Sequence, residues 1–169
     1  PTNDVTVGVS STDTTEGTVA ISGLTFSASN WNTPQTVTVT GVNDDIDDGN
    51  QAYNIVLAAA TSSDSNYNGV NPDDVAVTNN DDSDTLGITV SAISGTTTEA
   101  AGTATFTVVL TSEPTSDVTV GVSSSDTGEG TVNTASLTFT DSNWASAQTV
   151  TVSGVNDDID DGNQAYNIV

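Results

Sequence analysis

The sequence predicts an all-β protein, made of antiparallel sandwiches with seven strands per repeat, arranged in tandem and each incomplete in this chain. Three observations predict this fold class. Val, Ile, Leu and Phe occur in short alternating runs, the pattern of half-buried strands. Gly, Asp, Asn and Ser separate these runs at short intervals, as the turns of a sandwich require. No segment has the apolar periodicity of an amphipathic helix.

Internal repetition sets the domain organisation. A shift of 113 positions aligns residues 1–56 with residues 114–169 without a gap, and 43 of the 56 pairs are identical. Residues 1–84 therefore form the C-terminal part of one repeat, strands three to seven, and residues 85–169 form the N-terminal part of the next, strands one to six. Strands three to six occur twice. We expect a longer natural array, or neighbouring chains, to complete the open edges.

The first three strands of the period follow from alternating apolar side chains. Residues 88–92 form the first strand. Residues 103–110 form the second, in which Ala, Phe, Val and Leu at every other position share one face. Three valines at alternate positions define the third strand over residues 118–122, and residues 5–9 are its counterpart in the first half of the chain.

The remaining four strands are shorter or more polar. Leu and Phe two positions apart mark the fourth strand, at residues 24–26 and again at 137–139. Two valines mark the fifth at residues 37–39. The sixth covers residues 53–57, where Tyr, Ile and Leu point the same way, and two valines at residues 75–77 complete the unit.

Four large aromatic residues are predicted to pack rather than to bind. Trp31 and Trp144 each stand in a Ser-Asn-Trp triplet before the fifth strand, where a ring usually packs over the core or at its rim. A sugar-stacking role is the alternative for these rings. Tyr53 and Tyr166 are expected in the core, with the hydroxyl at a polar edge.

The charge of the chain excludes several classes of function. It has 23 acidic residues, no Lys, Arg or His, and a formal net charge of −23. Binding to nucleic acid or to an anionic membrane surface needs cations, so neither is an expected partner. No apolar run is long enough to insert into a membrane. Without His, Cys or Lys there is little to support catalysis, and we expect no enzyme activity.

The acidic loop is the main functional signal. Residues 41–56 recur unchanged as residues 154–169, and each copy has four aspartates within five positions, between strands five and six. Two carboxylates about 5 Å apart repel by roughly 3 kcal/mol at an effective dielectric near 20. A metal ion would supply the missing positive charge. The alternative is a solvated turn that keeps a β-protein soluble.

Other acidic residues should converge on this loop. The turns after strands one, three, five and seven lie at the same end of a sandwich, and they contain Glu99, then Asp126 and Glu129, then the acidic loop, then the aspartates of residues 81–84. Asp64, Asp73 and Asp74 lie elsewhere, and we interpret them as solvating. Oxygen ligands without His or Cys favour Ca²⁺ over zinc or copper. The spacing does not fit an EF-hand.

At these motifs the chain resembles the Calx-beta repeats of sodium/calcium exchangers, an integrin subunit and giant bacterial surface proteins of the adhesin type. Glu99 opens the run EAAGTATF, residues 43–48 match an Asp-rich turn, and residues 80–84 match a terminal aspartate triplet. Asn43, Asn156 and Ser83 depart from the pattern. The resemblance implies an immunoglobulin-like sandwich that binds calcium.

The resemblance also implies a set of ligands for each unit. In the first unit they are Asp13, Asp44, Asp48, Asp81, Asp82 and the carbonyl of Ile46; in the second they are Glu99, Asp126, Asp157, Asp161 and the carbonyl of Ile159. The neighbouring Asp45, Asp84 and Asp158 complete the candidate metal set.

These expectations describe a calcium-binding structural repeat of an extracellular bacterial surface protein or adhesin stalk, rigidified by calcium at the ends of its repeats. Its partners would be adjacent repeats or neighbouring chains, and a cell-surface ligand is a further candidate. Millimolar calcium outside cells suits such acidic sites. The alternative is a calcium-dependent recognition module that binds glycan or a protein. A calcium sensor is less consistent with nearly identical repeats.

Overall fold

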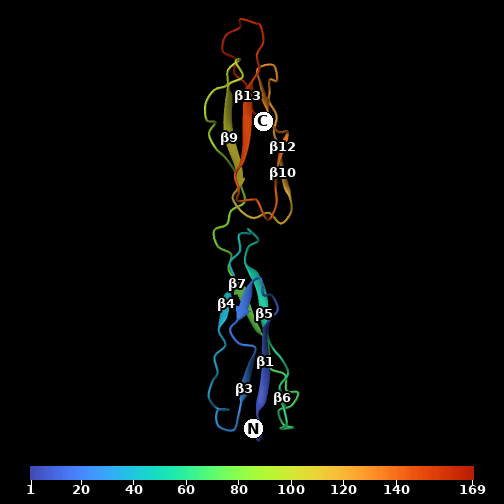
Figure 1. Cartoon of the computed structure of the whole chain (residues 1–169). Coiled ribbons are helices and arrows are strands. Elements are labelled where there is room, and N and C mark those ends of the chain that lie inside the picture. Colours follow the sequence, from blue (N-terminus) through green and yellow to red (C-terminus); the bar gives the residue numbers. More distant parts are fainter. The chain divides into compact units, whose positions relative to one another are not determined.

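The computed structural model describes residues 1–169, which form strands and no helix (Figure 1). The chain separates into two compact units. The first comprises Pro1–Asp44 and Asp48–Asp82, and the second comprises Asp45–Asp47 and Ser83–Val169. The predicted all-β class with antiparallel sheets is confirmed.

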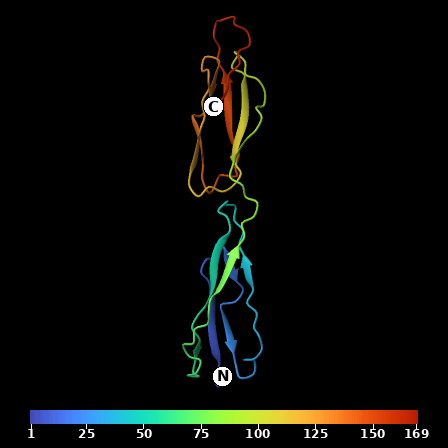
Figure 2. The same cartoon turned by 180° about the vertical axis from the view of Figure 1, so that it is seen from behind.

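The first unit contains one well-formed sheet and a fragment of another. The large sheet has the order β3-β1-β5-β7, with β6 paired to β1, and the small one pairs β2 with β4. The strands are β1 (Val5–Ser11), β2 (Gly17–Val19), β3 (Gly23–Phe26), β4 (Val39–Gly41), β5 (Gln51–Leu57), β6 (Thr61–Ser62) and β7 (Val75–Asn79). Seen from behind, β7 runs beside β5 over five register pairs (Figure 2).

The second unit contains the complementary pair of sheets. Its large sheet has the order β11-β13-β9-β8, and its small one pairs β10 with β12. The strands are β8 (Ile88–Val90), β9 (Thr103–Leu110), β10 (Val118–Gly121), β11 (Gly130–Val132), β12 (Ser136–Phe139) and β13 (Gln148–Gly154). Residues 164–168 correspond to most of β5 but form only one bridge, Ser124 with Ile168.

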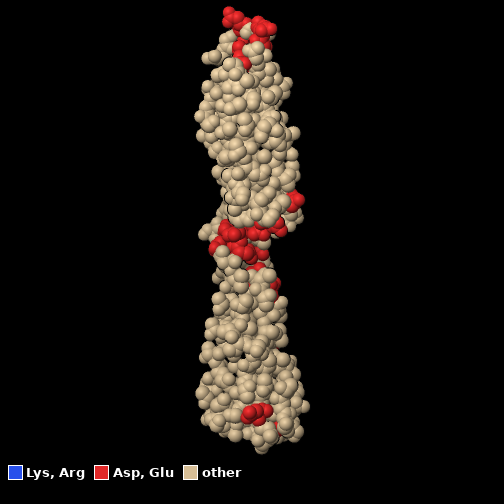
Figure 3. Space-filling model, viewed as in Figure 1, with Lys and Arg blue, Asp and Glu red and all other residues tan.

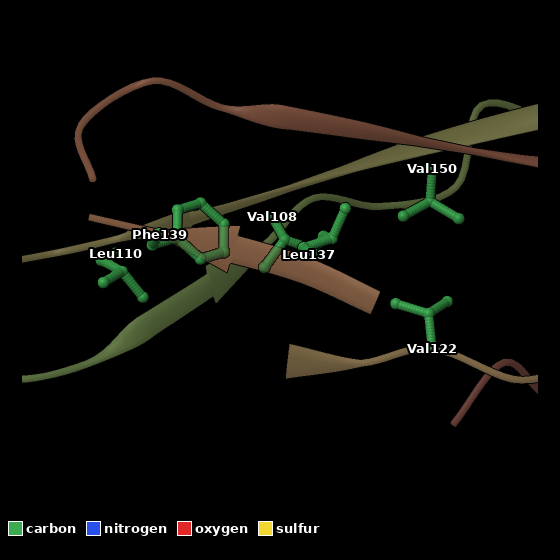
Figure 4. Close-up of a cluster of buried hydrophobic side chains, with 6 residues drawn as sticks. All are labelled: Val108, Leu110, Val122, Leu137, Phe139 and Val150. Atoms are coloured by element: carbon green, nitrogen blue, oxygen red, sulfur yellow. The ribbon is translucent and has the colours of Figure 1, made fainter. Parts of the chain in front are cut away.

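The core of the second unit lies between its two sheets. Phe139 and Val150 are fully buried, and Val108 and Leu110 of β9 pack in the same cluster (Figure 4). Each fully buried side chain of this kind stabilises the fold by about 1.5–3 kcal/mol. The alternation of β9 therefore places its apolar face where the sequence predicts it.

The core of the first unit is built mainly on its large sheet. Val9, Tyr53 and Ile55 are buried in one cluster, and Val5 and Val7 in another. Side chains from β3 and the approach to β4 are only half-buried around these clusters. The core of the first unit is therefore well covered beside β5 and β7 and more exposed beside β4.

Three short strands escape prediction: β2, β6 and β11. β2 and β11 each consist of Gly-Thr-Val, too short to show alternation, and they form because β4 and β13 offer them an edge. Each of the seven predicted strands overlaps a strand of the structure in at least one unit, but the sixth strand predicted for the second half forms only the bridge of Ser124 with Ile168.

Two expectations about individual residues are wrong. Trp144 packs against the core as predicted, but the ring of Trp31 is 58% exposed. Asp64 does not merely solvate its loop. It is buried, and its carboxylate accepts hydrogen bonds from the backbone N–H of Thr2 (2.8 Å) and of Asn66 (3.1 Å), which hold its pKa below the ordinary value.

Candidate metal centres

Three carboxylates converge at one end of the second unit. Glu129 directly precedes β11, and Asp157 and Asp161 lie in the acidic loop after β13. A carboxylate oxygen from each residue lies within 4.8 Å of the other two. Figure 3 shows acidic side chains gathered at the tip of this unit. The acids that face one another come from turns far apart in the sequence, as strand parity predicts.

The electrostatics of this cluster are those of an uncompensated anionic site. Partial burial raises the pKa of Glu129 above its ordinary value of 4.5, and the charges of Asp161, Asp157, Asp126 and Glu99 raise it further, in that order. Glu99 and Asp126 are therefore close enough to act on Glu129. Five carboxylates share this region, and the chain has no Lys, Arg or His to neutralise them.

The loop that carries the cluster is held by local hydrogen bonds. The Ile159 N–H donates to Asp157 Oδ1 (2.9 Å), and the Gln164 side-chain amide donates to the Asp161 carbonyl (3.0 Å). Gly162 follows with φ of 77°, a left-handed conformation that a side chain would strain. These contacts let a short run of aspartates bend back on itself toward Glu129.

The first unit has a second acidic site in the corresponding loop. A small cavity of about 20 Å³, room for one water-sized particle, is lined by ten residues, among them Glu16, Asp44, Asp48, Asp81 and Asp82. Gly49, at φ of 75°, donates its N–H to Asp81 Oδ2 (3.0 Å). The segment after β7 is therefore tied to the acidic loop.

Glu16 is held in this cavity by an asparagine. The Asn79 side-chain amide donates to Glu16 Oε2 (3.2 Å) and to the Val42 carbonyl (2.6 Å). Separately, carboxylate oxygens of Asp81, Asp82 and Asp84 lie within 4.8 Å of one another. The terminal aspartates therefore form an acidic group of their own.

Other predicted ligands lie apart from these groups. The Asp13 carboxylate accepts hydrogen bonds from the side chain and backbone of Thr15, which lower its pKa. Asp45 and Ile46 lie at the loop tip and do not line the cavity of the first unit. In the second unit, Asp158 and Ile159 are exposed next to the cluster.

Glu129 and Glu16 are the residues that motif matching omits. Neither is in the ligand set implied by the resemblance, yet Glu129 is one of the three residues of the second cluster and Glu16 lines the first cavity. Their position in the sequence could have identified them as candidate ligands. Each stands three residues after an aspartate and immediately before a Gly-Thr-Val strand, in the turn whose parity predicts convergence.

A family model for the Calx-beta domain matches residues 4–84 and again residues 79–169. The chain belongs to the Calx-beta family. A search of curated proteins finds no match to it. Calx-beta domains form a non-catalytic structural and binding family that is associated with calcium and occurs in extracellular or surface-facing regions of proteins. None of the chain's elements is a helix long and apolar enough to cross a membrane.

The residues present fit a calcium ion by their chemistry. Every candidate ligand offers oxygen, the donor that Ca²⁺ prefers, and no His or Cys is available to favour zinc. In the second unit Glu129, Asp157 and Asp161 would hold the ion. In the first, Asp44, Asp48 and Asp81 would do so. The ion would supply the positive charge that these clusters lack.

Proposed function

We propose that this chain is a calcium-binding structural segment of an extracellular surface protein, of the bacterial adhesin-stalk type, in which calcium stiffens the ends of the repeats. One observation carries the proposal. Glu129, Asp157 and Asp161 bring carboxylate oxygens within 4.8 Å of one another in a chain that has no basic side chain. Like charges held this close favour a bound divalent cation.

The order of the chain supports a role at repeat ends. Asp81, Asp82 and Asp84 follow β7, the last strand of one repeat, and precede β8, the first strand of the next. Calcium bound there would order the stretch that leads from one repeat to its neighbour. Calcium is millimolar outside cells, so sites with dissociation constants of about 10⁻⁴ to 10⁻³ M would be filled there.

A calcium-dependent recognition module is the second candidate. The exposed ring of Trp31 favours it, because an exposed aromatic ring can stack on a sugar. Its counterpart Trp144 is half-buried, and the Trp144 carbonyl accepts a hydrogen bond from the Leu110 N–H of β9 (3.2 Å). No strand equivalent to β9 covers Trp31 in the first unit. The exposure therefore has a structural origin, and we favour the stalk role.

Calorimetric titration of the full chain with Ca²⁺ tests the proposal. We expect binding heat that is reduced in Asp157→Asn/Asp161→Asn, and reduced by a different amount in the matched pair Asp44→Asn/Asp48→Asn. Titrations with Mg²⁺, and with NaCl at equal ionic strength, separate a specific site from general screening of the −23 charge. Heat that is absent, or equal for NaCl and Ca²⁺, would rule the calcium role out.

A further inference from the structure

The segment between β5 and β7 forms a closed loop over residues 60–70. The Ala60 N–H donates to the Val70 carbonyl (2.7 Å), and the Gly69 N–H donates back to the Ala60 carbonyl (2.8 Å). β6 attaches the loop to β1, at the end of the first unit where the N-terminus lies (Figure 1). Compact surface loops whose ends are joined in this way are frequently functional.

Asp64 holds the inside of this loop and is only 5% exposed. Its carbonyl accepts hydrogen bonds from the N–H groups of Tyr67 (3.0 Å) and Asn68 (3.1 Å). Its carboxylate accepts one from the N–H of Asn66 (3.1 Å) and one from the N–H of Thr2 (2.8 Å). One buried residue therefore fixes the backbone of residues 66–68.

The outside of the loop is an exposed and uncharged surface. Residues 65–71 read SNYNGVN, and every one of them is exposed. Tyr67 is 42% exposed and Val70 is 52% exposed. The Tyr67 hydroxyl and the side-chain amides of Asn66 and Asn71 have no hydrogen-bond partner within the chain. The loop thus presents an aromatic ring together with uncommitted polar groups on a fixed backbone.

This composition favours a small neutral ligand. Tyr, Ser, Asn and Gly predominate in the binding loops of antibodies, where tyrosine supplies rigid contact area and asparagine supplies hydrogen bonds. Residues 65–71 contain no carboxylate to attract a cation, and the net charge of −23 opposes an anion. Seven residues are too few for a stable protein interface, which takes about 20–30 residues on each side.

We propose that residues 65–71 bind a neutral sugar, with the ring of Tyr67 stacked on the sugar ring. The amides of Asn66 and Asn71 would donate to and accept from the sugar hydroxyls. Because the loop backbone is already fixed, binding costs little ordering entropy. The site goes beyond the proposed calcium role, since none of its residues lines the acidic cavity or belongs to an acidic cluster. It is also distinct from the surface at Trp31.

Saturation-transfer NMR of the full chain in chelator tests the proposal, with the methyl glycosides of glucose, galactose, mannose and N-acetylglucosamine as probes. We expect transfer from the protein to at least one glycoside, strongest at the protons on one face of the sugar ring, because that face would stack on Tyr67. Tyr67→Ala should abolish the transfer. Tyr67→Phe should keep most of it, since the ring face remains.

A second variant and a matched control make the test specific. Asn66→Ala should weaken the transfer several-fold, because it removes a hydrogen-bonding group and leaves the ring in place. Trp31→Ala removes another exposed aromatic ring of the first unit and should leave the transfer unchanged. Transfer to none of the four glycosides would overturn the proposal. So would transfer that survives Tyr67→Ala, or that is lost in Trp31→Ala.

Discussion

The two units share the nearly identical segments 1–56 and 114–169 and fold them into different halves of a sandwich. The first unit completes the sheet β3-β1-β5-β7 and keeps only β2 and β4 of the other sheet, while the second completes β11-β13-β9-β8 and keeps only β10 and β12. Phe139 is fully buried and Phe26 is not, although their strands share the sequence Leu-Thr-Phe. Because the local sequence is the same, the neighbouring strands decide how deeply each phenylalanine is buried.

The acidic sites differ in the same way. In the first unit Asp81 and Asp82, which follow β7, line the acidic cavity, and in the second the charge of Glu99 acts on Glu129. The acidic loop itself is identical in both units. Different residues outside the loop therefore surround it in the two units, which allows the two sites to be separated by mutation.

The largest expected difference concerns the core. Phe139→Ala should destabilise the second unit by about 3–5 kcal/mol, because it opens a cavity at a fully buried position. Phe26→Ala should destabilise the first unit by clearly less, because its ring is half-buried. Urea unfolding measures both, with Trp31 reporting the first unit in a Trp144→Phe background and Trp144 reporting the second in Trp31→Phe. Equal losses of stability in the two variants would contradict this difference between the units.

Two equivalent glycines, Gly17 and Gly130, provide a second comparison of the units. A Cβ at Gly17 would clash with the hydroxyl of Tyr53, and one at Gly130 would clash with the hydroxyl of Tyr166. Tyr53 is buried within β5, whereas Tyr166 is half-buried in a segment that forms no full strand, so its ring has more room to move. We expect Gly17→Ala to cost about 1–3 kcal/mol and Gly130→Ala less, by the same unfolding assay.

The calcium sites should respond to different mutations. Glu99→Gln should weaken calcium binding in the second unit only, and Asp81→Asn should weaken it in the first only. We expect each affinity to fall by about tenfold or more, because removing a group close to a metal has an effect of this size. Calcium titration followed by the fluorescence of each tryptophan would measure this. Matched losses in both units from either variant would contradict separate sites.

The smallest expected effect is a pH dependence of the second unit without calcium. The pKa of Glu129 is raised in the folded state, so folding takes up a proton and stability falls as pH rises from about 4.5 through the raised pKa. Glu129→Gln should remove this loss and slightly raise the unfolding midpoint at neutral pH in chelator. Glu16→Gln is the matched control, and it should show no such gain because Asn79 already donates to Glu16.

The sequence predicts the strands and the convergence of acids better than it predicts burial. Alternation locates β1, β5 and β9 because their apolar faces pack on a core. Turn parity correctly brings Asp157 and Asp161 toward the turn of Glu129. The exposure of Trp31 and the burial of Asp64 could not be predicted in this way, since one depends on a missing neighbouring strand and the other on a hydrogen bond from Thr2, 62 residues away in sequence.

Thermal unfolding of the Trp31→Phe and Trp144→Phe variants, in calcium and in chelator at matched ionic strength, tests the central claim most directly. A ligand that binds only the folded state raises its unfolding temperature. Binding at both acidic sites predicts a higher midpoint in calcium for each unit. Midpoints that are the same in calcium and in chelator, for both reporters, would contradict calcium binding by this Calx-beta segment.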